Sequence, residues 1–357
     1  MRILVINPGS TSTKIAVYED EKPLLLRRLS HKAEEIAGFP SVFAQKDFRL
    51  GVVLRELAKG EVDMNFDAVI GRGGLARALP GGVYEVDEQM CADVQHAVRQ
   101  HVCNLGCIIA YEIARTIAGC RAFIADPSVV DELEDEARIS GSPLCPRVPV
   151  WHALNQRAIA RRYAREHGKR YEDLNLIVCH MGGGTSVAAH RHGRAVSVNN
   201  ALDGEGPFSP ERAGTLPAAD LVRLCFSGRF TQDELLHRIA GEAGLAALLG
   251  TTDVCEIVDR IEHAGDERAK FYLDAMIYHT AKAIAAEGAV LEGNIESILI
   301  TGGVAHSEYV TSRLRRRIAF LAPVHVYPGE DEMQALALNA LEALRGRQEV
   351  KKYGALS

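Results

Sequence analysis

Ile3-Leu-Val-Ile-Asn-Pro-Gly-Ser-Thr-Ser-Thr-Lys-Ile-Ala-Val17 contains two apolar runs separated by a turn rich in Gly, Ser and Thr. A second stretch, Leu176-Ile-Val-Cys-His-Met-Gly-Gly-Gly-Thr-Ser-Val-Ala-Ala189, has the same design. Each pattern predicts a β-hairpin. The amides and hydroxyls of such a turn form a concave anion site, and glycine lets a phosphate approach closely. Two such hairpins, one near the start of each half, predict a duplicated fold that grips a polyphosphate from both sides.

Length and composition favour a soluble protein with two domains. The chain has 357 residues, of which 47% are apolar and 25% charged, and it is too long for one ordinary core. Its formal net charge of −6 argues against a nucleic-acid surface or a polybasic membrane anchor. No apolar run approaches the ~20 residues of a membrane span, and no signal-peptide pattern precedes the first strand. We expect a cytoplasmic protein whose eight cysteines are reduced and mostly buried.

A glycine and three prolines within residues 140–150 indicate the junction between the domains. We predict an N-terminal domain over 1–148, completed by the C-terminal helix within 333–357, and a second domain over 149–332. Apolar runs predict strands at 24–31, 67–72, 122–126, 297–301 and 324–327. Helical periodicity predicts helices at 43–59, 88–118 (broken near 104–106), 152–166, within 218–291 and at 331–345.

The commoner nucleotide-binding motifs are absent. Gly-x4-Gly-Lys-Ser/Thr does not occur, since Thr13 precedes Lys14, and there is neither a dinucleotide fingerprint nor a protein-kinase catalytic loop. Phosphate binding is therefore expected from the two turns. Their candidate residues are Ser10, Ser12, Lys14, Gly182, Gly183 and Gly184. Taken alone, the first Ser/Thr cluster is also compatible with a generic turn.

Three segments occur in the order found in a known superfamily: the two hairpins and Ile298-Leu-Ile-Thr-Gly-Gly-Val304. The chain resembles the superfamily of acetate and sugar kinases, heat-shock proteins and actin. The resemblance implies an α/β fold of two duplicated ribonuclease-H-like (actin-like ATPase) domains, with ATP in the cleft between them. Within it the chain is similar to the acetokinase family, whose first strand also ends in Asn-x-Gly-Ser-x-Ser/Thr-x-Lys. Sugar kinases, heat-shock proteins and actin carry Asp where Asn7 stands.

Further motifs over essentially the whole chain resemble the butyrate-kinase branch of this family. They are Arg72-Gly-Gly-Leu, Pro80-Gly-Gly-Val-Tyr-Glu, Asp126-Pro-Ser-Val-Val-Asp-Glu, His152-Ala-Leu-Asn-Gln, His180-Met-Gly-Gly-Gly-Thr and Pro328-Gly-Glu-Asp-Glu. Acetate kinases differ, with Gly-Asn-Gly at 182–184 and His-Gly-Thr-Ser-His at 152–156. The branch implies reversible in-line phosphoryl transfer, ATP + butyrate = ADP + butyryl phosphate, with Mg²⁺ accompanying ATP or ADP. It also implies a homo-oligomer, a dimer or larger.

Elementary chemistry leads to a similar site. A carboxylate acceptor has a pKa of roughly 4 to 5, so it is ionised at neutral pH and needs no general base. It needs cations that overcome its repulsion from the γ-phosphate. The loops expected near the nucleotide offer Arg72, Arg212, His152, His180 and Lys14.

The family resemblance implies a role for each candidate residue. Arg72 and Arg212 would grip the acyl carboxylate and the phosphoryl group, and His152 and His180 would hydrogen-bond the phosphoryl oxygens. Asp126 would orient the metal or an arginine. The Mg²⁺ shell, largely water and phosphate, would be organised by Asn7 and one carboxylate of 330–332, for which we favour Glu332. The nucleotide-side candidates are Asp253, near the ribose, with Gly302 and Gly303.

Each candidate also has a structural alternative. Arg72 could be a surface loop residue, Asp126 a turn former, and His152 a helix-cap residue. The remaining alternatives are a solvated helix start at Arg212 with Glu211, an acidic helix N-terminus at Glu330–Glu332 and an N-cap at Asp253. For the whole chain, the alternatives are a kinase for acetate, propionate or branched short-chain acids, and an actin-like nucleotide switch. Asn7 argues against a sugar kinase.

Overall fold

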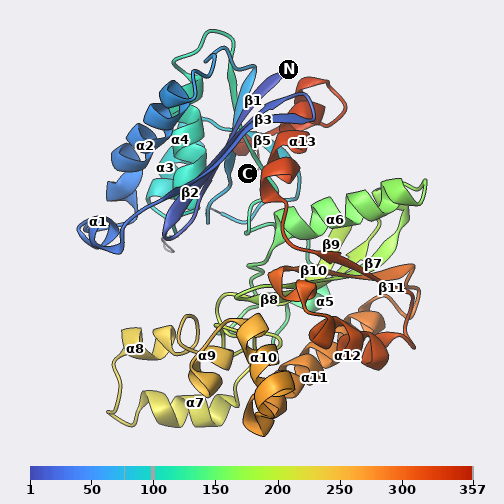
Figure 1. Cartoon of the computed structure of the whole chain (residues 1–357). Coiled ribbons are helices and arrows are strands. Elements are labelled where there is room, and N and C mark those ends of the chain that lie inside the picture. Colours follow the sequence, from blue (N-terminus) through green and yellow to red (C-terminus); the bar gives the residue numbers. More distant parts are fainter. Residues whose placement is uncertain (76, 98–100, 356–357) are drawn as a thin grey trace. The chain divides into compact units, whose positions relative to one another are not determined.

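The computed structural model describes residues 1–75, 77–97 and 101–355. The chain forms two compact units, Met1–Val130 with Asp331–Ser357, and Asp131–Glu330. Each unit has its own sheet (Figure 1). The C-terminal segment from Asp331 onward belongs to the first unit. The predicted domain boundary at 148/149 lies inside the second unit and stays a prediction.

The first unit is built on a seven-stranded sheet. Its strands are, in spatial order, β12 (Val350–Lys352), β5 (Val83–Glu85), β6 (Arg121–Ala125), β4 (Ala68–Arg72), β1 (Arg2–Pro8), β2 (Ser12–Glu19) and β3 (Lys22–Ser30). The hairpin β1–β2 and the pair β2–β3 are antiparallel, whereas β1–β4 and β4–β6 are parallel. Ile3 to Ile6 of β1 are all fully buried, as expected for a strand covered on both faces.

Helices cover both faces of this sheet (Figure 1). The helices α2 (Lys46–Lys59), α3 (Glu88–Gln95) and α4 (Asn104–Ala114) share an apolar core with Leu4 and Ile6. Helix α13 (Glu332–Leu344) packs against β1 and β4. The short helix α1 (Ala33–Ala37) follows β3.

The second unit repeats the central part of the first. Its five-stranded sheet has the order β11 (Val324–Pro328), β10 (Ser297–Gly302), β7 (Asn175–Met181), β8 (Thr185–Arg191) and β9 (Arg194–Val198). The pairs β7–β8 and β8–β9 are antiparallel, and β7–β10 and β10–β11 are parallel. Thus β9-β8-β7-β10-β11 matches β3-β2-β1-β4-β6 in order and direction. This match confirms the predicted duplicated ribonuclease-H-like fold.

Alternate residues of β7 face different helices. Ile177 and Cys179 lie in a core with α11 (Glu267–Val290) and α12 (Glu308–Ile318), whereas Leu176 and Val178 pack with α6 (Ala153–Glu166). This alternation follows from the two-residue period of a strand. The other helices are α5 (Asp135–Arg138), α7 (Ala218–Cys225), α8 (Gln232–His237), α9 (Gly244–Leu249) and α10 (Val254–Ala264). Short 3-10 helices span Phe43–Gln45, Tyr171–Asp173, Gly303–His306 and Tyr353–Ala355.

Two expectations need correction. The two helices predicted within 88–118 are present as α3 and α4, but the break predicted near 104–106 is misplaced, because Asn104 begins α4 and Gly106 lies inside it. Gly106 serves close packing instead: a Cβ there would lie 3.0 Å from the Arg72 nitrogen. The cysteines are all free thiols, but Cys145, Cys225 and Cys255 are exposed rather than buried. Within the described part of the chain, no helix is both long and apolar enough to span a membrane.

Candidate active site

The turn between β1 and β2 is closed by a hydrogen bond from the Gly9 amide to the Ser12 carbonyl, 2.7 Å long. Asn7, at the end of β1, pairs in register with Lys14 on β2. Asn7 and Ser12 are buried, whereas Ser10 and Lys14 are exposed. The structure therefore brings the predicted phosphate-binding residues of the first half together at one turn.

A buried arginine that sequence analysis missed supports this turn. Arg49 of α2 is fully buried. Its Nη1 donates to the Gly9 carbonyl (2.9 Å), the Ser12 carbonyl (3.2 Å) and Thr13 Oγ1 (3.1 Å), and its Nη2 donates to the Ser10 carbonyl (3.2 Å). Burial lowers the pKa of Arg49 to about 10, so it stays charged near neutral pH. Its position four residues before Val53, on the buried face of α2, was the available signal.

Glu332 connects two other predicted residues. Asn7 Nδ2 donates to Glu332 Oε2 at 2.6 Å. Arg72, at the end of β4, places Nη1 3.2 Å from Oε2 and Nη2 3.1 Å from Oε1 of the same carboxylate. The carboxylate lies at the first residue of α13, where a negative charge is favourable. Asn7, Arg72 and Glu332 thus form one polar cluster, in which Asn7 and Glu332 are buried and Arg72 is partly exposed.

The three consecutive acidic residues have three different environments. Glu330 Oε1 lies 2.9 Å from His180 Nε2 in the second unit. Asp331 caps α13 by accepting a hydrogen bond from the Gln334 amide at 3.1 Å. Glu332 contacts Asn7 and Arg72. Sequence alone could not separate these neighbours.

Asp126 follows β6 and is almost completely buried, with a positive φ of 40°. Its Oδ1 accepts from the Gly82 amide at 2.8 Å, and its own amide donates to the Gly82 carbonyl at 3.0 Å. The carboxylate therefore helps to fix the turn at Gly82. A role in orienting a metal or an arginine stays a prediction.

The second glycine turn packs tightly against the loop that carries Arg212. Gly182 closes the turn by donating to the Gly184 carbonyl at 2.9 Å. A Cβ on Gly183 would lie 2.7 Å from Glu211 Oε2, and one on Gly184 would overlap Arg212 Nη1. Arg212 Nη1 donates to the Ala201 carbonyl at 2.9 Å, and burial lowers the pKa of Arg212. Arg212 is therefore part of the glycine turn's surroundings, not a solvated helix start.

His152 and His180 lie face to face in the second unit. Their rings stack with centroids 3.9 Å apart at an angle of 16°. His180 Nδ1 lies 2.8 Å from Asn155 Oδ1, and His152 Nδ1 lies 2.8 Å from Ser186 Oγ. His180 Nε2 is near Glu330 without the alignment of a hydrogen bond. Sequence analysis identified both histidines but missed Asn155 and Ser186 as their partners.

The residues predicted on the adenosine side of the nucleotide are Gly302, Gly303 and Asp253, and each has its own local surroundings in the fold. Gly302 has a φ of 94° and exchanges backbone hydrogen bonds with Gly329, and a Cβ on it would overlap the Met181 carbonyl. A Cβ on Gly303 would meet open space. Asp253 caps α10, accepting from the amides of Cys255 (2.8 Å) and Glu256 (3.3 Å). The structural alternative for Asp253 is therefore realised, and contact with a ribose stays a prediction.

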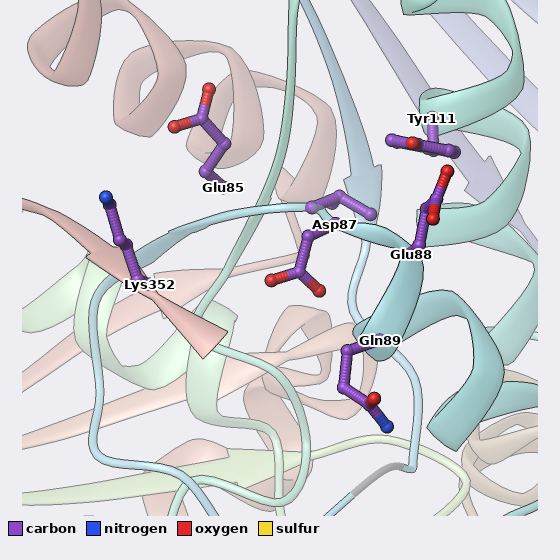
Figure 2. A pocket seen from close by; sticks show the side chains of 7 residues that line it. Glu85, Asp87, Glu88, Gln89, Tyr111 and Lys352 are labelled. Atoms are coloured by element: carbon purple, nitrogen blue, oxygen red, sulfur yellow. The ribbon is translucent and has the colours of Figure 1, made fainter. Parts of the chain in front are cut away.

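A surface hollow on the first unit is not this site. It has a volume of about 600 Å³ and is lined by Glu85, Val86, Asp87, Glu88, Gln89, Tyr111 and Lys352. Figure 2 shows the carboxylates of Glu85, Asp87 and Glu88 around it. A hollow with this charge repels a polyphosphate, and none of the predicted site residues lines it.

Comparison with known proteins assigns the family. The model of the acetokinase family matches residues 150–326. A probable butyrate kinase of Bacteroides thetaiotaomicron is 61% identical over 353 residues, covering 99% of this chain and 100% of the relative. The chain belongs to the acetokinase family. Butyrate kinase 2 of Clostridium acetobutylicum, also similar, is 49% identical with 99% of each chain covered. An acetokinase is a phosphotransferase that uses ATP to phosphorylate a carboxylate.

Solved structures show the acetokinase fold independently. Acetate kinase of Porphyromonas gingivalis superimposes with a TM-score of 0.80 at 19% identity, covering 96% of this chain and 100% of that one. A propionate kinase of Francisella tularensis gives a TM-score of 0.77 at 14% identity, with 95% and 98% covered. At these identities the likeness shows the fold alone.

Acetokinases use ATP with a divalent metal, and the first unit contains residues that fit one. The described residues include no group of three or more His, Cys, Asp or Glu side chains that could hold an ion. Asn7 and Glu332 instead offer an amide oxygen and a carboxylate side by side. Such a sparse set suits a cation held mainly by water and phosphate oxygens, as Mg²⁺ usually is.

Proposed function

We propose that this chain is a butyrate kinase, catalysing ATP + butyrate = ADP + butyryl phosphate reversibly with Mg²⁺. The names of its full-length relatives support butyrate as the acceptor. The structural observation that carries the proposal is the set of donors at the glycine turn of the second unit. There the stacked His152 and His180 and the half-buried Arg212 lie around Gly182–Gly184.

In the proposed reaction, one butyrate oxygen attacks the γ-phosphorus in line while the bond to the β,γ-bridging oxygen breaks. The carboxylate needs no base, because it is already ionised. Arg72 and Arg212 bind the acyl carboxylate and the transferring group, and His152 and His180 donate hydrogen bonds to its oxygens. These contacts neutralise the negative charge that spreads over the phosphoryl oxygens.

The remaining residues of the proposal bind nucleotide and metal. The turn residues Ser10, Ser12, Lys14 and Gly182–Gly184 bind phosphate oxygens, Asp253 the ribose, and Gly302 and Gly303 the adenosine side. Asn7 and Glu332 would hold Mg²⁺, which neutralises phosphate charge when bound, and Asp126 orients an arginine or the metal. We further propose that the enzyme is cytoplasmic and forms a dimer or larger homo-oligomer.

Acyl-chain preference depends on the volume of the apolar part of the acid-binding site. One methylene changes the specificity of an apolar pocket by only about 10- to 200-fold. Trp151 is a candidate for the pocket wall, but its side chain is buried edge-on against the His190 ring at 5.9 Å. Acetate, propionate and branched short-chain acids therefore belong in any test.

The test is an assay with Mg-ATP and acetate, propionate, butyrate, isobutyrate or valerate. Hydroxylamine traps acyl phosphate as hydroxamate, and ADP release is followed in parallel. We expect hydroxamate to peak with C4 acids and to disappear in Arg72→Ala and Arg212→Ala. The exposed Arg170 provides the control, and Arg170→Ala should retain activity. A peak at acetate or propionate contradicts the choice of butyrate. Slow ADP release independent of any acid contradicts kinase function and favours a nucleotide switch.

A further inference from the structure

A chain of buried polar side chains leads from His152 into the second unit. It links Ser186 and His190 of β8, Gln156 of α6 and Tyr171 of a 3-10 helix. Ser186, Gln156 and His190 are fully buried, and Tyr171 is nearly so. Buried polar groups must satisfy one another, so the direction of each hydrogen bond can be worked out by counting donors and acceptors.

The Ser186 carbonyl fixes the orientation of the Gln156 amide. Gln156 has one amide atom 3.0 Å from the Ser186 carbonyl oxygen and 2.9 Å from Ser186 Oγ. A carbonyl oxygen only accepts hydrogen bonds, so this amide atom must be Nε2. Its two hydrogens go to the carbonyl and to Oγ. The other amide atom, Oε1, therefore faces His190 Nε2 at 3.1 Å and accepts from it.

The Ser186 hydroxyl then has one hydrogen left to give. Its oxygen accepts from Gln156 Nε2 and from the His152 backbone amide, which is 3.4 Å away. These two bonds use both lone pairs of the hydroxyl oxygen. Its single hydrogen points to His152 Nδ1, at 2.8 Å. Nδ1 is therefore an acceptor, and the neutral His152 ring carries its proton on Nε2.

The hydrogen bonds of His190 and Tyr171, at the end of the network farthest from His152, run in the same direction. Burial lowers the pKa of His190 to about 3, which keeps that ring neutral. Its Nε2–H donates to Gln156 Oε1, so its Nδ1 accepts from the Tyr171 hydroxyl at 2.6 Å. Within this network, each of these hydrogens therefore has its own acceptor.

We infer that Gln156 and Ser186 are positioning residues that hold His152 in its Nε2–H tautomer. The opposite edge of the ring then presents a hydrogen-bond donor to the transferring phosphoryl group without requiring a positive charge. This donor role rests on the proposed function, whereas the tautomer does not. In the stacked His180, the ring atom that contacts a partner is also Nδ1, which lies 2.8 Å from Asn155 Oδ1.

We expect a change at Gln156 to affect catalysis as changes at other residues that orient a functional side chain do. Partners of this kind typically change metal binding or activity by about 10- to 100-fold when altered. Gln156→Glu keeps the shape of the side chain but can give Ser186 at most one hydrogen bond in place of two. The Ser186 hydroxyl is then free to accept from His152 Nδ1, and the tautomer is no longer fixed.

The decisive measurement is the imidazole ¹⁵N–¹H spectrum of the full chain labelled at histidine, without ligand, with His152 assigned by His152→Asn. We expect Nδ1 of His152 to be unprotonated and Nε2 protonated in the wild type, and a mixture of tautomers in Gln156→Glu. We also expect kcat of Gln156→Glu to fall about 10- to 100-fold while KM for ATP stays within about twofold. The matched control is Tyr171→Phe, which leaves the Gln156–Ser186 contacts in place and should preserve the His152 tautomer.

A wild-type His152 with its proton on Nδ1 overturns the inference, and this result needs no variant to fold. Equal loss of kcat and of the tautomer signal in Tyr171→Phe and Gln156→Glu also overturns it, since it indicates general loosening. Failure of the proposed function would give a different combination of results. In that case no acyl phosphate forms, while the spectrum still reports the Nε2–H tautomer.

Discussion

At the residue scale, the buried charge of Arg49 is the main energetic cost of forming the turn between β1 and β2. A buried guanidinium loses its hydration, and it is stable there only because oxygens of the turn replace the water. The turn also depends on Arg49, because this one planar guanidinium donates hydrogen bonds to the carbonyls of Gly9, Ser10 and Ser12. Arg49 is thus a structural residue that supports the turn we propose to bind phosphate.

Arg49→Met should lower the free energy of unfolding by about 1–3 kcal/mol, because several buried carbonyls lose their donor. It should also raise KM for ATP more than KM for the acid, since the turn loses its support. Urea unfolding and initial-rate kinetics measure the two effects. Arg55→Met, at an exposed position of the same helix, is the control. An unchanged KM for ATP in Arg49→Met contradicts the supporting role.

Glu332 provides a second prediction at this scale. Glu332→Gln keeps the shape of the side chain but removes the charge that pairs with Arg72. The Mg²⁺ concentration at half-maximal rate should rise about tenfold or more. The neighbouring Asp331 is the control, because Asp331→Asn retains a good N-cap and should leave the Mg²⁺ requirement unchanged. An equal shift in both variants would refute the assignment of the metal carboxylate to Glu332.

At the scale of elements, α4 and β4 approach so closely that both need glycine at the contact. A Cβ on Gly71 would lie 3.0 Å from the Cys107 nitrogen, and one on Gly106 would be equally near the Arg72 nitrogen. The helix therefore supports the strand end from which Arg72 extends. Asn104, at the start of α4, adds a hydrogen bond from the Leu75 amide to its Oδ1, 2.9 Å long.

Gly106→Ala should push α4 away from β4, costing about 1–3 kcal/mol of stability and raising KM for the acid through Arg72. Thermal unfolding and kinetics measure both. Gly51→Ala is the control, and its expected effect on stability has the opposite sign, because a Cβ there meets only the flexible Arg55 side chain. In the interior of α2 this change should stabilise the protein by about 0.5–1 kcal/mol. Two variants of equal stability would disprove the close-packing argument.

The elements that sequence reasoning found are those with strong local signals. Both glycine hairpins and the helix over 152–166 were predicted from periodicity and turn chemistry. The three-residue strands β5 and β12 were missed, because so short a run carries no period. The break between the two helices predicted within 88–118 was placed too late, near Gly106, because this glycine lies inside α4 and serves a contact between distant segments.

The same distinction explains what could be predicted of the candidate site. His180 and Arg72 stand at strand ends near glycines, and His152 directly precedes helix α6, so their motifs were visible in the chain. Gln156 lay within a quoted motif, yet its partner Ser186 comes from a strand 30 residues away. The separation of Glu330 from Glu332 likewise depends on where each side chain points. Long-range contacts of this kind are outside the reach of local pattern.

At the scale of the whole molecule, stability should depend on a buried acid in the second unit. Glu287 of α11 has an Oε2 that is buried and without a hydrogen-bond partner among the described residues. Burial, opposed by a hydrogen bond from Ser197, raises the pKa of its carboxyl to about 7. The folded state therefore binds this proton more tightly than the unfolded state, for which the ordinary value is 4.5.

Because the folded-state pKa is raised, its contribution to stability is complete below pH 4.5 and is lost as pH rises towards about 7. Glu287→Gln should flatten the decrease of Tm over this range. Calorimetry at several pH values measures it, with the exposed Glu292→Gln as control. Parallel Tm profiles for the wild type and Glu287→Gln would exclude the buried acid as the cause.

The discontinuity of the first unit has a consequence for biosynthesis. Helix α13, which packs on β1 and β4, is encoded after the entire second unit. A ribosome therefore finishes all of Asp131–Glu330 while one face of the earlier sheet still lacks its cover. The nascent first unit is exposed to proteases and chaperones for the whole of that interval. Slow translation of the second unit should therefore harm the folding of the first more than that of the second.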